Sequence, residues 1–296
     1  MPTPHRTARQ VFIFATVITA LTVMMGGLVC ATESGLACPT WPTCHGSQIM
    51  PGAHLPGWIE FSHRLVSGLC LFSLILAAMI QFRREERDPW LRWLPVGAVA
   101  GAIAAAILGM SIVLWGISPA FAAFDLMCSL LALCAITFAT VGFLRGHFRW
   151  RWTRASSFGM VALGSLLVMH ALGVLVAGKE SFTRCLGWPV FALIEHDKWA
   201  GLQAARWVAA IVVIVALGVM VLAAPRLRGL LAGLFGLIIV ELALGAVLMG
   251  AGPLWLRGIY SIIAGAIVAL TAYASVEAGL DKRRDANPEE LDEIAL

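Results

Sequence analysis

The chain has 296 residues, of which 60% are hydrophobic and only 13% charged, and its formal net charge is +4. Soluble globular proteins contain about 25% charged residues, so this chain has too little polar surface to cover a water-exposed fold. The composition excludes an ordinary soluble enzyme, a disordered chain and a nucleic-acid-binding protein with a basic face, and it indicates an integral membrane protein embedded in a lipid bilayer.

Eight apolar runs are long enough to be membrane-spanning helices, because a helix needs about 20 apolar residues to cross the hydrocarbon layer. The first run follows Arg6 and Arg9, is longer than the apolar core of a signal peptide, and is not followed by a small-residue cleavage site. We therefore predict that it is retained as a helix, and its end at Cys30 matches a lipid-attachment site only weakly. The predicted spans are residues 11–29, 59–82, 95–115, 119–144, 157–178, 200–224, 229–251 and 254–278.

The Lys and Arg residues are distributed unevenly between the segments that connect the spans. Fifteen of the 21 lie before the first span, after the eighth, or in every second connection, whereas only three lie in the alternate connections. By the positive-inside rule, both termini are expected in the cytoplasm, with the chain in the cell (inner) membrane. The loops 30–58 and 179–199 then face outward, and the acidic tail 285–296 is expected to be solvated and partly disordered.

The first outer loop contains two cysteines, Cys38 and Cys44, separated by five residues that include two prolines. Disulfides persist on the oxidising, outer side of a membrane. The pair is therefore expected to form a disulfide that clamps the loop as a lid over the neighbouring helices. A redox-active dithiol and a metal site with His45 are the alternatives, although metal sites usually combine more closely spaced cysteines with more ligands.

Glu60, His63 and Arg64 form an ionisable group at the outer end of the second span. Their spacings of three and four residues place them on one face of a helix. A histidine there can bind haem iron, a neighbouring arginine can meet a haem propionate, and a partly desolvated glutamate can exchange a proton. The alternative is an ion-pair cluster that anchors the helix at the membrane surface.

Three acidic residues and one histidine also lie within the other predicted spans, where charges usually mark function. Asp125 lies deeper than Glu60, and both a ligand-facing role and a structural bond to a neighbouring helix are open. His170 is a possible ligand, but a lone histidine more often bonds a backbone carbonyl or a neighbouring helix. Glu241 lies mid-span without an evident role, whereas Glu277 lies near the cytoplasmic end and is expected to be solvated.

The second outer loop repeats part of the first, as an internal duplication would produce. In the second loop Phe191 takes the place of Cys44, so Cys185 is expected to be unpaired and this loop to lack a disulfide clamp. Glu33, Ser34, Cys38, Trp41 and Pro42 recur, at the same spacing, as Glu180, Ser181, Cys185, Trp188 and Pro189.

The repeat predicts two halves with the same order of elements: a helix, a long outer loop and three further helices. Arg64 then corresponds to Arg206, and an even number of spans per half gives parallel halves related by an axis along the membrane normal. We predict an all-α integral membrane protein whose eight transmembrane helices form two tandem four-helix bundles related by internal duplication. The halves are residues 1–148 and 149–284, followed by the tail 285–296.

Three stretches together resemble the heme A synthase family, and the eight spans extend the resemblance over almost the whole chain. Members of that family convert heme O to heme A for cytochrome oxidase by oxidising a ring methyl to a formyl group, through two hydroxylations and the loss of water. The resemblance implies a catalytic first half under the cysteine pair and a second half that holds haem b. The stretches are Gly26-Gly-Leu-Val29, Thr32-Glu-Ser-Gly-Leu-Ala-Cys38-Pro-Thr-Trp41-Pro-Thr-Cys44-His-Gly46 and Ile59-Glu60-Phe-Ser-His63-Arg64.

In the first half, the resemblance makes Glu60 the essential glutamate, His63 a haem ligand, and Cys38 and Cys44 the cysteine pair of the lid. The position of the second catalytic-half histidine falls on Asp125. The family's pattern is therefore only partly present around the catalytic site.

The second half departs further from the family. Its two family histidines fall on Ala205 and on Tyr260, or on Ser261 if the alignment is held strictly, so one of four family histidines remains. Alanine has no ligating atom, and tyrosine, serine and aspartate are poor ligands for a low-spin haem b. We therefore predict that the second half does not hold haem as the family does.

Three functions are consistent with these residues. In the first, the protein oxidises heme O, with Glu60 and His63 catalytic and with His63, Arg64 and Asp125 binding the haem. In the second, it binds haem or assists assembly of cytochrome oxidase without turnover. The third is a membrane transporter, which Asp125 and Glu241 would suit but which leaves the lid unexplained. Expected partners are heme O, the heme O synthase, the cytochrome oxidase assembly machinery and a second copy of the chain, with no nucleic acid.

Overall fold

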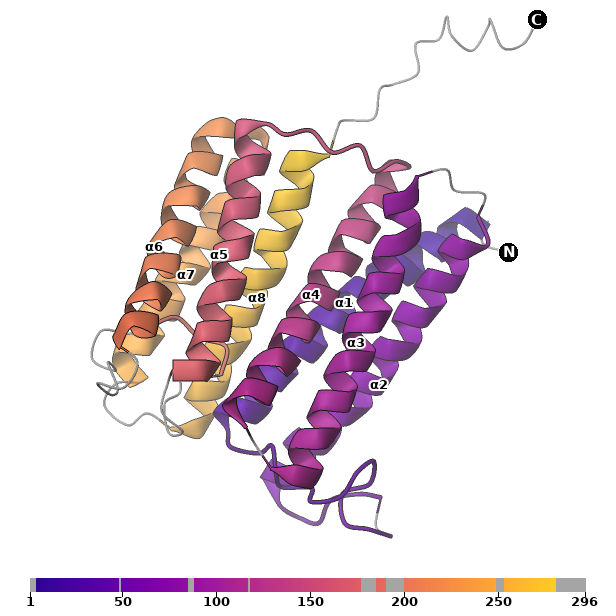
Figure 1. The fold of residues 1–296 in the computed structure, drawn as a ribbon, viewed down its shortest axis with the longest axis vertical. Coiled ribbons are helices and arrows are strands. Elements are labelled where there is room, and N and C mark those ends of the chain that lie inside the picture. Colours follow the sequence, from indigo (N-terminus) through magenta and orange to yellow (C-terminus); the bar gives the residue numbers. More distant parts are fainter. Residues whose placement is uncertain are drawn as a thin grey trace, which may run out of the picture.

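The structure is a computed structural model that describes residues 4–47, 49–84, 88–116, 118–176, 185–189, 200–248 and 253–280. Within these ranges the chain forms eight long helices (Figure 1), each long and apolar enough to cross a membrane. The eight predicted spans are confirmed, whereas the tail 285–296 and most of the loop 179–199 lie outside the described residues. The helices are α1 (Pro4–Ala31), α2 (Leu55–Phe82), α3 (Pro89–Trp115), α4 (Pro119–Arg145), α5 (Arg154–Val176), α6 (Ala200–Ala223), α7 (Arg228–Leu248), preceded by the short turn η4 (Pro225–Leu227), and α8 (Leu254–Gly279).

Proline and polar caps set the starts of several helices. α3 begins at Pro89, whose missing N–H would have no partner in the first turn, and the side chain of Asp88 accepts a hydrogen bond from the Trp90 amide at 3.0 Å. The same carboxylate accepts the Phe148 amide at 2.7 Å, which joins two connections at one end of the bundle. α4 ends at Gly146, whose φ of 76° suits a glycine cap.

Helices α1–α4 form one group and α5–α8 a second group beside it, and we call these the first and second halves (Figure 1). The two halves meet where α1 and α4 pack against α8 and α5. Gly258 and Gly265 of α8 allow close approach, because a Cβ on either would crowd Leu28 or Met24 of α1. The two four-helix groups agree with the predicted architecture, while their origin by duplication and their exact boundaries stay predictions.

The two halves differ in how far their hydrophobic cores extend. The outer end of the molecule, as we use the term, is the end that carries residues 32–54 and that the charge distribution predicts to face away from the cytoplasm; it lies lowest in Figure 1. The core of the second half reaches this end, where Leu186 and Trp188 are 2% and 1% exposed. The core of the first half stays nearer the opposite end, with Phe12, Leu74 and Ile136 among its members.

At the inner end, polar contacts join the two halves. Arg145 at the end of α4 forms an ion pair with Glu277 of α8 and donates to the Leu280 carbonyl at 3.2 Å. The expectation that Glu277 is merely solvated is therefore wrong. Its partner lies in the other half, and the pairing is possible only because α4 and α8 end side by side.

Candidate functional site

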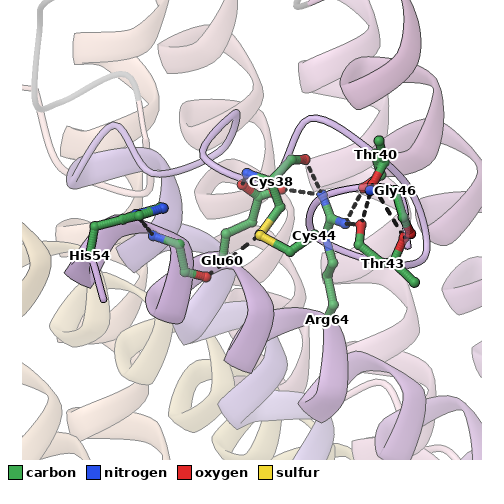
Figure 2. The surroundings of a disulfide bond; sticks show 9 residues. Cys38, Thr40, Thr43, Cys44, Gly46, His54, Glu60 and Arg64 are labelled. Carbon is green, nitrogen blue, oxygen red and sulfur yellow. Dashed lines mark hydrogen bonds and ion pairs between the residues drawn. A yellow bond between two sulfur atoms is a disulfide. The ribbon is translucent and has the colours of Figure 1, made fainter. Parts of the chain in front are cut away.

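A compact loop covers the outer end of the first half. Cys38 and Cys44 form a disulfide within it, as predicted, and both residues are fully buried. The loop is held in shape by Thr43, whose hydroxyl donates to the Gly46 carbonyl at 2.7 Å, and by the Gly46 amide, which donates to the Thr40 hydroxyl at 2.9 Å. Figure 2 shows these contacts gathered around the disulfide. We call residues 32–54 the lid.

Glu60 and Arg64 of α2 hold the lid in place (Figure 2). One carboxylate oxygen of Glu60 accepts the Cys38 amide at 2.8 Å, and the other forms an ion pair with Arg64. Arg64 donates from Nη2 to the Cys38 carbonyl at 2.8 Å, and from Nη1 to the carbonyls of Thr40 at 2.6 Å and Thr43 at 3.1 Å. The predicted shared face of Glu60 and Arg64 is thus the face that binds the lid, and both terminal nitrogens of Arg64 are engaged there.

The prediction that His63 shares this face is not confirmed: its ring lies against α1, and of the three residues only Glu60 and Arg64 bond the lid in the described structure. A Cβ added at Gly26 would lie 3.3 Å from Cε1 of the His63 ring, so this glycine makes room for the imidazole. The Nδ1 atom of His63 is buried and has no hydrogen-bond partner among the described residues. A buried imidazole nitrogen without a partner is unfavourable unless a ligand or a metal completes its bonding.

Asp125 lies about 9 Å inward from the outer end of α4, close to the depth of His63 on α2. It shares a face of α4 with Ala132, which packs on Gly101 of α3, and with Ile136, which belongs to the core of the first half. Asp125 therefore faces the interior of the first half, but no hydrogen bond links it to His63 in the described structure.

Burial in the first half is lower at this depth than in the core farther from the outer end. Gly26, His63 and Asp125 face inward and yet remain only partly buried. Leu74 and Ile136, farther from the outer end, are fully buried in the core. Protein interiors are normally close-packed, so this lower burial makes the region beneath the lid the candidate ligand site of the first half.

The second half is filled at the corresponding depth by its own chain. Residues 185–189, which we call the plug, insert between its helices and are all buried. Ser261 donates to the Leu186 carbonyl at 2.8 Å and Tyr260 donates to the Trp188 carbonyl at 2.7 Å. Arg206 donates to the Gly187 carbonyl at 3.0 Å. The residues of α6 and α8 that align with the family's haem region therefore bind backbone.

Cys185, at the start of the plug, forms a disulfide with Cys30 at the end of α1. The predictions that Cys185 is unpaired and that the second loop lacks a clamp are therefore wrong. The repeat offered a partner only within the same loop, where Phe191 takes the place of a cysteine. The actual partner lies 155 residues earlier, in the other half. The available signal was that Cys30 ends the first apolar run and Cys185 lies in the second outer loop, so both are on the side where disulfides persist.

His170 and Glu241 are also buried in the second half, with 2% and 0% exposure. Neither ring nitrogen of His170 has a hydrogen-bond partner among the described residues, so the expected bond to a backbone carbonyl or a neighbouring helix is not found there. Arg206, whose guanidinium packs against Gly173 of α5, lies next to His170. This arrangement places a cation beside the imidazole.

Comparison with known proteins identifies the family. The family model described as cytochrome oxidase assembly protein matches residues 9–272. The chain belongs to the heme A synthase family. It is 26% identical over 280 residues to a heme A synthase from Exiguobacterium sp., covering 90% of this chain and 91% of the relative. It is 27% identical over 229 residues to one from Geobacillus thermodenitrificans, covering 73% and 71%, and 33% identical over 138 residues to one from Shouchella clausii, covering 46% of each.

Heme A synthase family members bind haem, and the two halves of this member suit haem unequally. In the first half, the imidazole of His63 is partly accessible and its Nδ1 has no partner among the described residues, so this residue offers a donor that fits haem iron. In the second half, Ala205 is exposed on α6 and has no ligating atom, while the hydroxyls of Tyr260 and Ser261 are bonded to the plug. The residues of the second half do not fit a haem bound in the family's manner.

Proposed function

We propose that this protein binds heme O in its first half and oxidises a ring methyl to a formyl group, which yields heme A for cytochrome oxidase. The observation that carries the proposal is the imidazole of His63: it is partly accessible, its buried Nδ1 has no partner among the described residues, and it lies on the helix that holds the disulfide-clamped lid. The relatives named heme A synthase, which align over most of the chain, support the same activity.

In this proposal His63 is the protein ligand of the haem iron, and the bound haem supplies the oxidative chemistry. The lid excludes water from the reacting methyl group. Asp125, on the face of α4 that carries core residues of the first half, is the second proposed haem-facing residue. The heme O synthase and the cytochrome oxidase assembly machinery are the expected donor and recipient of the haem.

Glu60 and Arg64 act through the lid. Arg64 was expected to bind a propionate, but its terminal nitrogens hold three lid carbonyls, so it binds a propionate only when it releases the lid. Glu60 remains the proposed proton carrier. Protonating Glu60 removes the charge that pairs with Arg64 and weakens the lid contact, so proton exchange at this residue is coupled to opening of the lid.

The test is product formation in cells that supply heme O. Haem is extracted from the purified protein and its surrounding membranes and is identified by chromatography and mass spectrometry. The wild type is expected to produce heme A, and His63→Ala to lose both bound haem and product. His170→Ala is the matched control, because it removes a buried imidazole from the second half and is expected to leave the product unchanged. Product formation by His63→Ala at the wild-type level contradicts the proposal.

A second candidate function is haem binding for oxidase assembly without turnover. It is favoured by the second half, where Ala205 and Tyr260 replace the histidines that a second haem would need. The same experiment separates the two functions. Haem that is bound through His63 and recovered as unchanged heme O supports the assembly role.

A further inference from the structure

Helix α1 separates the haem-facing space of the first half from the plug of the second half. Its two adjacent glycines contact opposite partners. A Cβ at Gly26 would lie 3.3 Å from the His63 ring, whereas a Cβ at Gly27 would lie 3.0 Å from Leu186 of the plug and 3.2 Å from the Ser261 hydroxyl. One turn of α1 therefore contacts both the His63 ring and the plug, through two adjacent glycines.

The plug is fixed at each of its first four residues. The Cys185 side chain is bonded covalently to Cys30, and the carbonyls of the next three residues accept hydrogen bonds from Ser261, Arg206 and Tyr260. All three donors are fully buried. A buried donor that loses its acceptor is costly, so the plug has one strongly preferred position.

The covalent bond acts next to the histidine. Cys30 follows Gly26 by four residues and Gly27 by three, so it lies about one turn farther out on α1. The second half therefore contacts α1 through the disulfide and through Leu186, and both contacts lie within about one turn of Gly26, which packs against His63. Movement of the plug would carry this turn of α1 with it.

We propose that the plug replaces a second cofactor in the second half and that Cys185 and Leu186 position His63 through α1. The inference rests on the proposed role of His63 as a haem ligand. In this proposal the outer region of the second half is occupied by polypeptide and holds no haem. The second half supports the first by fixing the position of one turn of α1. Cys185 and Leu186 are positioning residues, because neither contacts the haem-facing space.

The experiment titrates the purified full-length protein in detergent with hemin and records the Soret band, the EPR spectrum of the ferric haem and the number of haems bound. The wild type is compared with the double variant Cys30→Ser/Cys185→Ser and with Gly27→Ala, whose added methyl would press on Leu186 and Ser261. Gly164→Ala is the matched control, since nothing lies within 4 Å of its added Cβ. His63→Ala reports whether His63 binds the iron at all.

The expected result is saturation of the wild type at about one haem, with an imidazole-ligated EPR signal that depends on His63. The double variant and Gly27→Ala are expected to bind hemin about tenfold more weakly, as is typical when support behind a metal ligand is lost. Their EPR signals are expected to become heterogeneous, whereas Gly164→Ala matches the wild type. Gly27→Ala keeps both disulfides, so it tests the inference even if the double variant fails to fold.

Two outcomes overturn the inference alone: unchanged affinity and EPR signal in both plug variants, or two haems per wild-type chain. If His63→Ala binds hemin like the wild type, the proposed role of His63 fails and the inference fails with it. These outcomes are distinguishable, because the first two require an intact dependence on His63.

Discussion

Removing the carboxylate of Glu60 is expected to destabilise the protein more than any exposed carboxylate does. Glu60 is 3% exposed and accepts the Cys38 amide while pairing with Arg64. Glu60→Ala leaves that amide without a partner, at a cost of about 1–3 kcal/mol, and leaves a largely buried guanidinium without its counter-charge. Arg64 keeps its hydrogen bonds to three lid carbonyls, and these limit the loss. We expect a total loss of about 3–5 kcal/mol in unfolding free energy.

Glu60→Gln keeps an acceptor for the Cys38 amide and loses only the charge, so its expected cost is smaller, about 1–2 kcal/mol. Glu33→Gln is the matched control, because that side chain is 66% exposed and lies 3.9 Å from Arg257. An exposed pair of this kind contributes less than about 1 kcal/mol.

The assay is unfolding in mixed micelles with increasing SDS, followed by tryptophan fluorescence, together with the rate at which a protease cleaves the lid. The expected order of stability is wild type and Glu33→Gln, then Glu60→Gln, then Glu60→Ala. If Glu60→Ala unfolds at the same SDS fraction as Glu33→Gln and its lid is no more cleavable, Glu60 does not anchor the lid.

Three further predictions follow from the described contacts. Tyr260→Phe removes the hydroxyl that donates to the Trp188 carbonyl at 2.7 Å. SDS unfolding is expected to show a loss of about 1–2 kcal/mol with an unchanged number of haems per chain at saturation. Two haems in the wild type and one in Tyr260→Phe would show that Tyr260 is a ligand. Gly101→Ala places a Cβ 2.9 Å from the Cys128 carbonyl and should cost about 1–3 kcal/mol by overpacking α3 on α4, whereas Gly97→Ala, with open space around it, should be neutral or stabilising. In denatured, unreduced protein, a maleimide–polyethylene glycol reagent should label three of the seven cysteines. After reduction it should label all seven. Five labelled cysteines before reduction would contradict one of the two disulfides.

Much of the fold follows from local sequence. An apolar run of the right length is helical in a bilayer because every backbone group must be bonded within the segment, so the eight spans were predictable one at a time. The Cys38–Cys44 disulfide was also predictable from local sequence, because its two residues lie six apart in one loop.

Contacts between the halves were not predictable in this way. The Cys30–Cys185 bond and the Arg145–Glu277 ion pair each join residues more than a hundred positions apart. Their formation depends on α1 and α4 packing beside α8 and α5, and no local pattern encodes this packing. The internal repeat even left Cys185 without a partner, because it compared equivalent loops and not neighbouring ones.

The candidate site shows the same division. The spacing of Glu60 and Arg64 placed them together, but their partners are the backbone of the lid, which residue types alone do not reveal. The substitutions Ala205 and Tyr260 predicted that the second half departs from the family. That a segment of the protein itself lies between these helices, with Leu186 and Trp188 buried, became visible only in the structure.

The proposal that the first half binds one haem through His63 is tested most directly by the number and type of haems per chain in the purified protein. These come from pyridine haemochrome spectra, chromatography of the extracted haem and amino-acid analysis. We predict about one haem per chain, recovered as heme O or heme A, and almost none in His63→Ala. Two haems per chain including haem b, or a haem content that does not depend on His63, would contradict it.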